Sequence, residues 1–132
     1  MWLLKTEPTA YAYEDLEKAG TATWDGVTNP VALKNLRRMQ EGDRAIIYHT
    51  GDEKAAVGLA RVTKAAYPDP KAGDPKRVVV DLEPVGRLAR PVALARIKSL
   101  PVFAESPLVR QGRLSVVPLT HAQWTALERE SR

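Results

Sequence analysis

The segment Lys76–Val85 alternates between two faces. Val78, Val80 and Leu82 point one way and the residues between them point the other, which is the two-residue period of a β-strand. Apolar, β-branched and aromatic stretches predict further strands over residues 1–5, 21–24, 44–50, 57–64 and 113–119. These strands are short and bunched, with helices inserted between them. The pattern therefore predicts an α+β fold that contains a small barrel.

Helix signals separate the predicted strands. Asn29 and Pro30 form a helix start, because asparagine caps free amide groups and proline fits the first helical position. This helix is expected to end at residues 41–43. Thr120 and Gln123 form a capping box that begins a terminal helix over residues 120–130. Shorter helices are predicted over residues 13–19 and 94–100, and an exposed loop over residues 67–75.

Composition excludes several kinds of site. The chain has no cysteine, which rules out disulfides, thiolate metal sites and cysteine catalysis. No spacing of Asp, Glu and His indicates a metal, and no cofactor-binding motif occurs. The apolar run in MWLLKTEP is too short for a signal peptide, and no stretch approaches the roughly 20 apolar residues of a membrane helix. We expect one domain over residues 1–132, cytoplasmic, with no cofactor, metal or membrane partner.

Positive charge is concentrated in the second part of the chain. Residues 1–86 hold 12 basic and 13 acidic side chains, whereas residues 87–132 hold 8 basic and 3 acidic ones. Between Arg87 and Arg113 the cations are five arginines and one lysine. The guanidinium fork matches the oxygens of phosphate, so the cluster is consistent with a nucleic-acid partner. A solvated basic surface is the alternative interpretation.

The stretch ATWDGVTNP, residues 22–30, combines an aromatic, a carboxylate, a glycine and an amide before a capped helix. A rigid turn there would hold the indole of Trp24 in one orientation, as a stacking platform for a base. The alternative is that Trp24 plugs the end of the barrel. Asp25 can accept from an exocyclic amine, and Asn29 can donate and accept, although capping competes with that use. Trp2 and Trp124 are expected in the core.

Catalytic motifs are absent. His121 lies in the first turn of the last helix and is expected to be solvated, and His49 belongs to the strand RAIIYHT. No known hydrolase or nucleotide-binding pattern surrounds either residue. A hydrolytic site in which His49 works with Glu7 or Asp25 has no support from the sequence, so we expect the protein not to be an enzyme.

Five segments together resemble one known family. They are WLLKTEP at residues 2–8, WDGVTN at 24–29, IYHT at 47–50, AYPDP at 66–70 and RQGRLSV at 110–116. In this order and spacing they resemble the EVE domain, a member of the PUA-like superfamily that is related to the YTH readers of methylated RNA. The resemblance covers almost the whole chain.

The resemblance implies a PUA-like small mixed β-barrel with peripheral short helices, and a pocket that takes up a modified base. Modified cytosine in DNA is the leading ligand class, and a modified RNA base is the second. The implied base-pocket residues are Lys5, Thr6, Glu7, Trp24, Asp25, Val27, Asn29, Tyr48 and His49. The implied phosphate, sugar or rim residues are Arg110, Arg113, Leu114 and Ser115. An effector would be a separate protein, and the oligomeric state stays open.

Some positions depart from the family pattern. Thr6 stands where serine is more common, and Gly112 replaces a serine. Thr28 stands where arginine is common, which removes a cation close to Trp24. These departures affect the choice of ligand and the phosphate contacts rather than the fold. A protein-interaction or small-ligand-binding accessory module is the alternative function, and its binding would not share the steep salt dependence of phosphate contacts.

Overall fold

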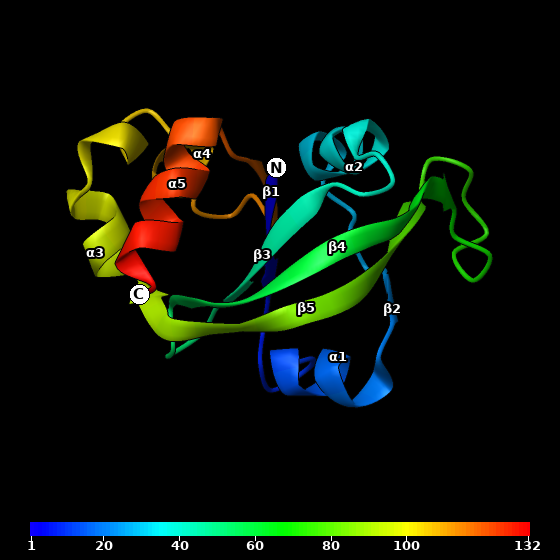
Figure 1. The fold of residues 1–132 in the computed structure, drawn as a ribbon. Coiled ribbons are helices and arrows are strands. Elements are labelled where there is room, and N and C mark those ends of the chain that lie inside the picture. The colour runs from blue at the N-terminus through cyan, green and yellow to red at the C-terminus, as the bar shows by residue number, and fades with distance from the viewer.

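A six-stranded mixed sheet forms the centre of the computed structural model, which describes all 132 residues (Figure 1). Its strands lie in the order β2-β5-β4-β3-β1-β6. Strands β1 and β3 are parallel, and the other neighbouring pairs are antiparallel. The bounds are β1 Trp2–Thr6, β2 Ala22–Trp24, β3 Arg44–His49, β4 Ala55–Pro68, β5 Val78–Ala93 and β6 Val116–Pro118. The sheet curls into a half-barrel with β2 and β6 at its two edges, which confirms the expected PUA-like fold class.

Strands β4 and β5 form a long hairpin that runs the length of the sheet (Figure 1). Both strands are longer than the sequence pattern predicted, and β6 is shorter. The register of the hairpin shifts at four places. Each shift interrupts the alternation of side chains between the two faces and bends the strand. A two-residue period in the sequence therefore reveals only part of each strand. Tyr67 and Pro68, expected in a loop, pair with Val79 and Val78 at the end of the hairpin.

Five short α-helices and one 3-10 turn lie around the sheet (Figure 1). They are α1 Tyr13–Ala19, α2 Pro30–Arg38, α3 Leu94–Ser99, η1 Pro101–Phe103, α4 Pro107–Arg110 and α5 His121–Glu130. The predicted Asn29 cap is confirmed, because its Oδ1 accepts from the amides of Val31 and Ala32. The Thr120–Gln123 capping box is confirmed as well. No helix is long and apolar enough to cross a membrane.

The core is a single cluster of buried apolar side chains. Trp2 and Trp124 belong to it, as predicted. The indole N–H of Trp2 donates to Asp43 at 3.0 Å, so its buried polar group is satisfied. The same carboxylate accepts from the amide of Gln40 and so orders the turn between α2 and β3. This core supports the sheet from which the site is built.

Candidate functional site

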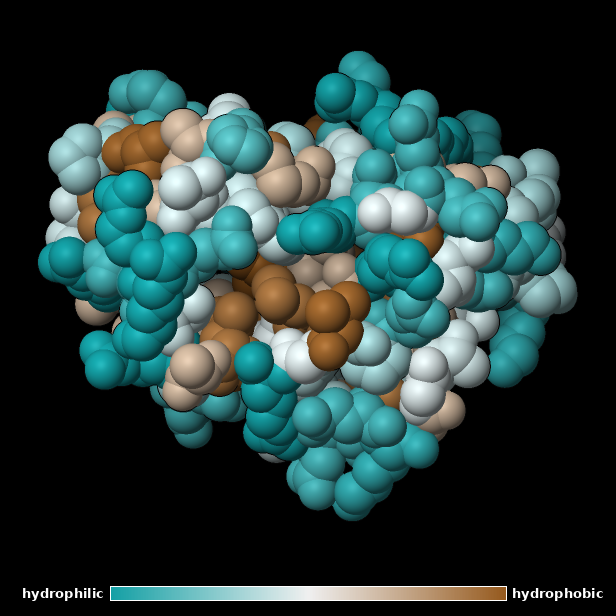
Figure 2. All heavy atoms as spheres, viewed as in Figure 1, coloured by the Kyte–Doolittle hydropathy of each residue, from teal (hydrophilic) through white to brown (hydrophobic).

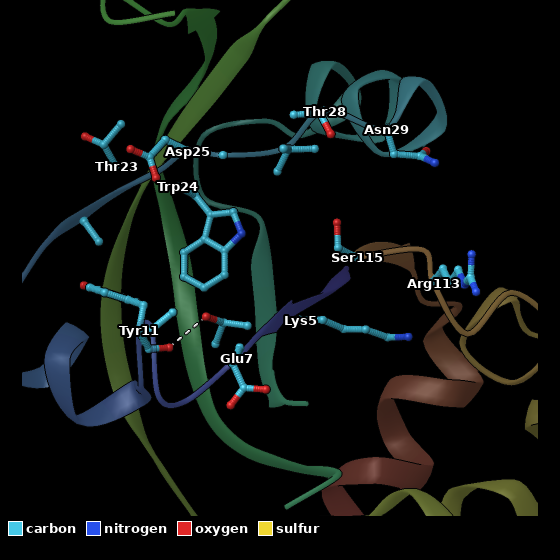
Figure 3. A pocket seen from close by; sticks show the side chains of 15 residues that line it. Lys5, Glu7, Tyr11, Thr23, Trp24, Asp25, Thr28, Asn29, Arg113 and Ser115 are labelled. Atoms are coloured by element: carbon cyan, nitrogen blue, oxygen red, sulfur yellow. Dashed lines mark hydrogen bonds between the residues drawn. The ribbon is translucent and has the colours of Figure 1, made fainter. Parts of the chain in front are cut away.

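A cavity of about 800 Å³ is lined from both edges of the half-barrel (Figure 3). One wall comes from β2 and the residues after it, and the other from the end of β1 and the residues before β6. Its volume is that of a small-molecule site. We call it the Trp24 cavity. Its lining residues are Lys5, Thr6, Glu7, Ala10, Tyr11, Ala22, Thr23, Trp24, Asp25, Gly26, Val27, Thr28, Asn29, Arg113 and Ser115.

The wall at β2 is held by short-range geometry and by one carboxylate of β5. Gly26 has φ +76°, a left-handed conformation that suits glycine and turns the chain away from the strand. Asn29 then caps α2. Asp81 accepts from the hydroxyl of Thr23 at 3.0 Å and from that of Tyr67 at 2.6 Å. The hydrogen bond from Tyr67 to this carboxylate is the main reason why the pKa of Tyr67 is raised.

Trp24 is at once a core residue and a wall of the cavity. Only 8% of the residue is exposed, and it belongs to the hydrophobic cluster. The ring of Tyr11 meets the indole edge to face, with centroids 6.1 Å apart and planes at 84°. Burial, followed by the charge of Asp15, raises the pKa of Tyr11, so the phenol stays neutral. These contacts hold the indole in place. Trp24 can therefore close the end of the barrel, as one interpretation of the sequence has it, and still present its ring to the cavity, as the other requires.

Polar groups around the indole have defined hydrogen-bonding capacity. The hydroxyl of Thr6 donates to the carbonyl of Tyr11 at 2.7 Å, which leaves its oxygen free to accept. The Oδ1 atom of Asn29 already accepts two amides, so only its Nδ2 donors remain for a ligand. Asp25 adds an exposed carboxylate that can only accept. The cavity lining therefore offers both acceptors and donors.

Cationic side chains lie on the wall opposite the indole (Figure 3). Lys5 extends away from Trp24, and its ammonium donates to the carbonyl of Gly112 at 2.8 Å. Partial burial lowers the pKa of Lys5. Arg113 is exposed and also lines a smaller neighbouring cavity. The backbone carbonyl of Ser115 accepts from the amide of Lys5 at 2.9 Å, which ties this segment to β1.

Comparison with known proteins identifies the chain. The family described as EVE domain matches residues 1–130. The chain belongs to the EVE domain family. The resemblance drawn from the five sequence segments is thereby confirmed. Thymocyte nuclear protein 1 of Mus musculus is 32% identical to this EVE domain over 158 aligned residues, which cover 93% of this chain and 70% of that protein.

Solved structures with the same fold accompany these relatives. A protein from Agrobacterium tumefaciens superposes with a TM-score of 0.95 at 34% identity, over 98% of this chain and 91% of that chain. Human THYN1 protein superposes with a TM-score of 0.90 at 31% identity, over 99% of this chain and 96% of that chain. That structure is a complex with 5-methylcytosine containing DNA.

Most of the implied base-pocket residues of the EVE domain line the Trp24 cavity, but Tyr48 and His49 do not. Strands β1 and β3 adjoin as expected, and Lys5 pairs with Tyr48 and Thr6 with His49. His49 is nevertheless buried and bonded on both ring nitrogens: Nε2 accepts from the amide of Tyr13 at 3.0 Å, and Nδ1 lies 2.7 Å from Glu53. A backbone amide can only donate, so the ring is the neutral Nδ1–H tautomer. Both ring nitrogens are engaged within the chain, which argues against the implied contact of His49 with a base edge.

Replacing His49 by phenylalanine is expected to destabilise the fold without removing ligand affinity. The buried amide of Tyr13 would lose its acceptor, which costs about 1–3 kcal/mol. Urea unfolding measures this loss, and strand binding below the unfolding transition measures the function. If the folded variant lost binding selectively, His49 would have to contact the ligand after all.

Arg110 and Leu114 also lie outside the Trp24 cavity. The guanidinium of Arg110 donates to the carbonyl of Ala104 at 3.0 Å and to Glu105 at 2.8 Å. Its guanidinium is thus directed to the turn between η1 and α4. Leu114 is buried in the core. Of the other implied rim residues, Arg113 and Ser115 line the Trp24 cavity, and Leu114 lines the smaller cavity that shares Arg113. The contacts of these residues with phosphate or sugar stay a prediction.

Tyr11 also lines the Trp24 cavity, although the sequence did not single it out as a pocket residue. The chain folds back after Pro8, and the amide of Tyr11 donates to the carbonyl of Glu7 at 2.9 Å. This turn returns Tyr11 to Thr6 and to the indole. A proline directly after the strand was the available signal for such a return.

Proposed function

We propose that this EVE domain is a non-catalytic reader that takes up a modified base in the Trp24 cavity, with 5-methylcytosine in DNA as the first candidate. The observation that carries the proposal is the indole of Trp24 lining a cavity of about 800 Å³ between acceptors and cations. The human relative in complex with 5-methylcytosine containing DNA supports the choice of ligand. A modified RNA base is the second ligand class.

Energetics assign different roles to stacking and to polar contacts. Stacking on an aromatic ring contributes about 1–3 kcal/mol per base. Removing a base from a duplex costs a few kcal/mol, so stacking alone roughly offsets the flip. One buried methyl group adds about 0.8 kcal/mol, or roughly fourfold in affinity. We therefore expect modest selectivity for the methyl group itself and a larger contribution from the polar wall.

The hydrogen-bonding groups of the cavity fit cytosine. Asp25 and the oxygen of Thr6 can accept from the exocyclic amine, which is a donor. The Nδ2 donors of Asn29 suit the acceptor atoms on the same edge of the base. Asn29 can serve the ligand and the helix together because capping uses only its oxygen.

An Asn29→Asp variant separates these two uses. Aspartate caps a helix as well as asparagine does, and its charge favours the helix N-terminus, so stability is expected to be unchanged or slightly higher. The two N–H donors are lost and a negative charge faces the base. We expect binding of the preferred strand to fall about tenfold or more, because an acceptor of the base that is left without its donor costs about 1–3 kcal/mol. Thermal unfolding and fluorescence anisotropy check the two halves of the prediction, and equal affinity would remove Asn29 from the base contacts.

The function itself is tested with short labelled single strands. They carry cytosine, 5-methylcytosine, hydroxymethylcytosine or a modified RNA base, each at two salt concentrations. The proposal expects tighter, salt-sensitive binding to one modified strand. Negligible and equal binding to all strands would favour the accessory module for a protein or small ligand.

A further inference from the structure

Three lysines converge on a small cavity beside the Trp24 cavity. The cavity measures about 180 Å³, and its lining includes Lys5, Lys54, Lys98 and Tyr48 but no carboxylate. None of the three lysines takes part in an ion pair of the chain. We call it the lysine cavity. The carboxylate of Glu7 borders the cavity at Thr50, whose hydroxyl donates to it at 3.4 Å, but it forms no ion pair with any of the three lysines. Cations that share a cavity repel one another, so this gathering of three is suited to an anion.

The three lysines come from distant parts of the chain. Lys5 lies on β1, Lys54 on the turn between β3 and β4, and Lys98 on α3. Lys54 has φ +45° and is the only residue other than glycine with a positive φ, a conformation that is unfavourable for a side chain with Cβ. The carbonyl of Lys54 accepts from the amide of Leu94 at 2.8 Å, which ties this turn to the start of α3. The fold therefore holds Lys54 at this position against its local preference.

Lys5 connects the two cavities. It lines both, and its ammonium lies 5.8 Å from the ring centroid of Tyr48 in the lysine cavity. The lysine cavity is smaller than the roughly 300 Å³ at which sites for whole small molecules begin, so it suits a single small group. Besides the lysines, its lining consists of two glycines, the hydroxyl-bearing Tyr48 and Thr50, and the apolar side chains of Leu94, Leu108 and Val109.

We propose that the lysine cavity binds the phosphodiester group that adjoins the nucleotide in the Trp24 cavity. This inference rests on the proposed function, because the base in one cavity brings its own backbone to the other. In the proposed complex, the ammonium of Lys5 lies between the base and the phosphate. The lysines bind as point charges, so the site fits a phosphate of any sequence and adds affinity without selectivity for the base.

The test uses Lys54→Gly and Lys98→Gln, singly and together, with Lys71→Gln as the matched control. Glycine accepts the backbone conformation of Lys54, so that variant is expected to fold at least as stably. Lys71 is an exposed lysine that lines neither cavity. The probes are the best-bound strand, the same strand with neutral methylphosphonates on both sides of the modified base, and inorganic phosphate.

We expect the double variant to bind the normal strand roughly tenfold more weakly. The slope of log affinity against log salt concentration is expected to be smaller in magnitude by about 0.7, the contribution of one phosphate contact on a single strand. The preference for the modified base is expected to persist. The methylphosphonate strand is expected to bind wild type and double variant equally, and Lys71→Gln to match wild type. Unchanged strand binding in the double variant would overturn the proposal.

Two further outcomes are separable. Lysine-dependent binding of inorganic phosphate, with strand binding insensitive to the methylphosphonates, would make this a site for free phosphate and would overturn the proposal. If wild type preferred no modified base, the proposed function would fail by itself. The phosphodiester site would then be judged on an unmodified strand, with the same loss of salt slope supporting it and an unchanged slope contradicting it.

Discussion

A Trp24→Leu variant is expected to bind the preferred modified strand about 5- to 150-fold more weakly than wild type, because stacking worth roughly 1–3 kcal/mol is lost. Leucine keeps an apolar side chain at a position that is 92% buried, so part of the core packing survives. The edge-to-face contact with Tyr11 is lost as well. Fluorescence anisotropy with modified and unmodified strands measures the effect, below the unfolding temperature of the variant.

The matched control is Trp124→Leu. Trp124 is also buried, but it lies on α5 and lines a different cavity with Leu59 and Val85. Figure 2 shows apolar side chains in a hollow over the middle of β4 and β5, the strands that carry those two residues. This variant is expected to lose stability and keep its affinity. Equal binding by folded Trp24→Leu and wild type would exclude a stacking role for Trp24.

A Gly58→Ala variant is expected to lose stability. A Cβ at Gly58 would stand 2.5 Å from Cζ and 2.6 Å from Cδ1 of the Tyr13 ring. That ring cannot move freely, because its hydroxyl donates to the carbonyl of Leu59 at 2.6 Å and accepts from the amide of Gly86 at 3.1 Å. Overpacking of this kind costs about 1–3 kcal/mol and sometimes more. Calorimetry is expected to show a melting temperature lower by roughly 5–10 °C.

Gly86→Ala is the control for this effect. Gly86 lies on β5 in the same hairpin, but a Cβ there meets no atom within 4 Å. Its amide still donates to Tyr13 after the change. We expect a melting temperature within a degree or two of wild type, since such surface changes stay within about 0.5 kcal/mol. Similar losses in both variants would show that glycine is needed for the hairpin backbone rather than for the approach of Tyr13.

Features that depend on neighbouring residues could be predicted from the sequence. Asn29 with Pro30, and Thr120 with Gln123, begin helices through hydrogen bonds within one turn of chain. The first five strands were located because their apolar or alternating segments extend over several residues. The family was recognised for a related reason, since its five segments are short and keep their order.

Strand ends and side-chain directions could not be predicted in this way. The register between β3 and β4 shifts between Ile47 and Tyr48, and neither Tyr48 nor His49 lines the Trp24 cavity. Arg110 was placed with the rim because RQGRLSV resembles a family segment, but the fold directs its guanidinium to Ala104 and Glu105. Such outcomes depend on pairing and packing with distant segments, which no local pattern records.

The sequence by itself therefore determined the helix starts, most of the strands, the family and the residues around Trp24 that surround one cavity. Only the tertiary structure decided that His49 accepts from the buried amide of Tyr13 and that Lys5, Lys54 and Lys98 line one small cavity. The physical reason is how far apart in the sequence the interacting residues lie. Caps and alternation are satisfied by adjacent residues, whereas burial, hydrogen-bond partners and the gathering of charges depend on which distant segments the sheet brings together.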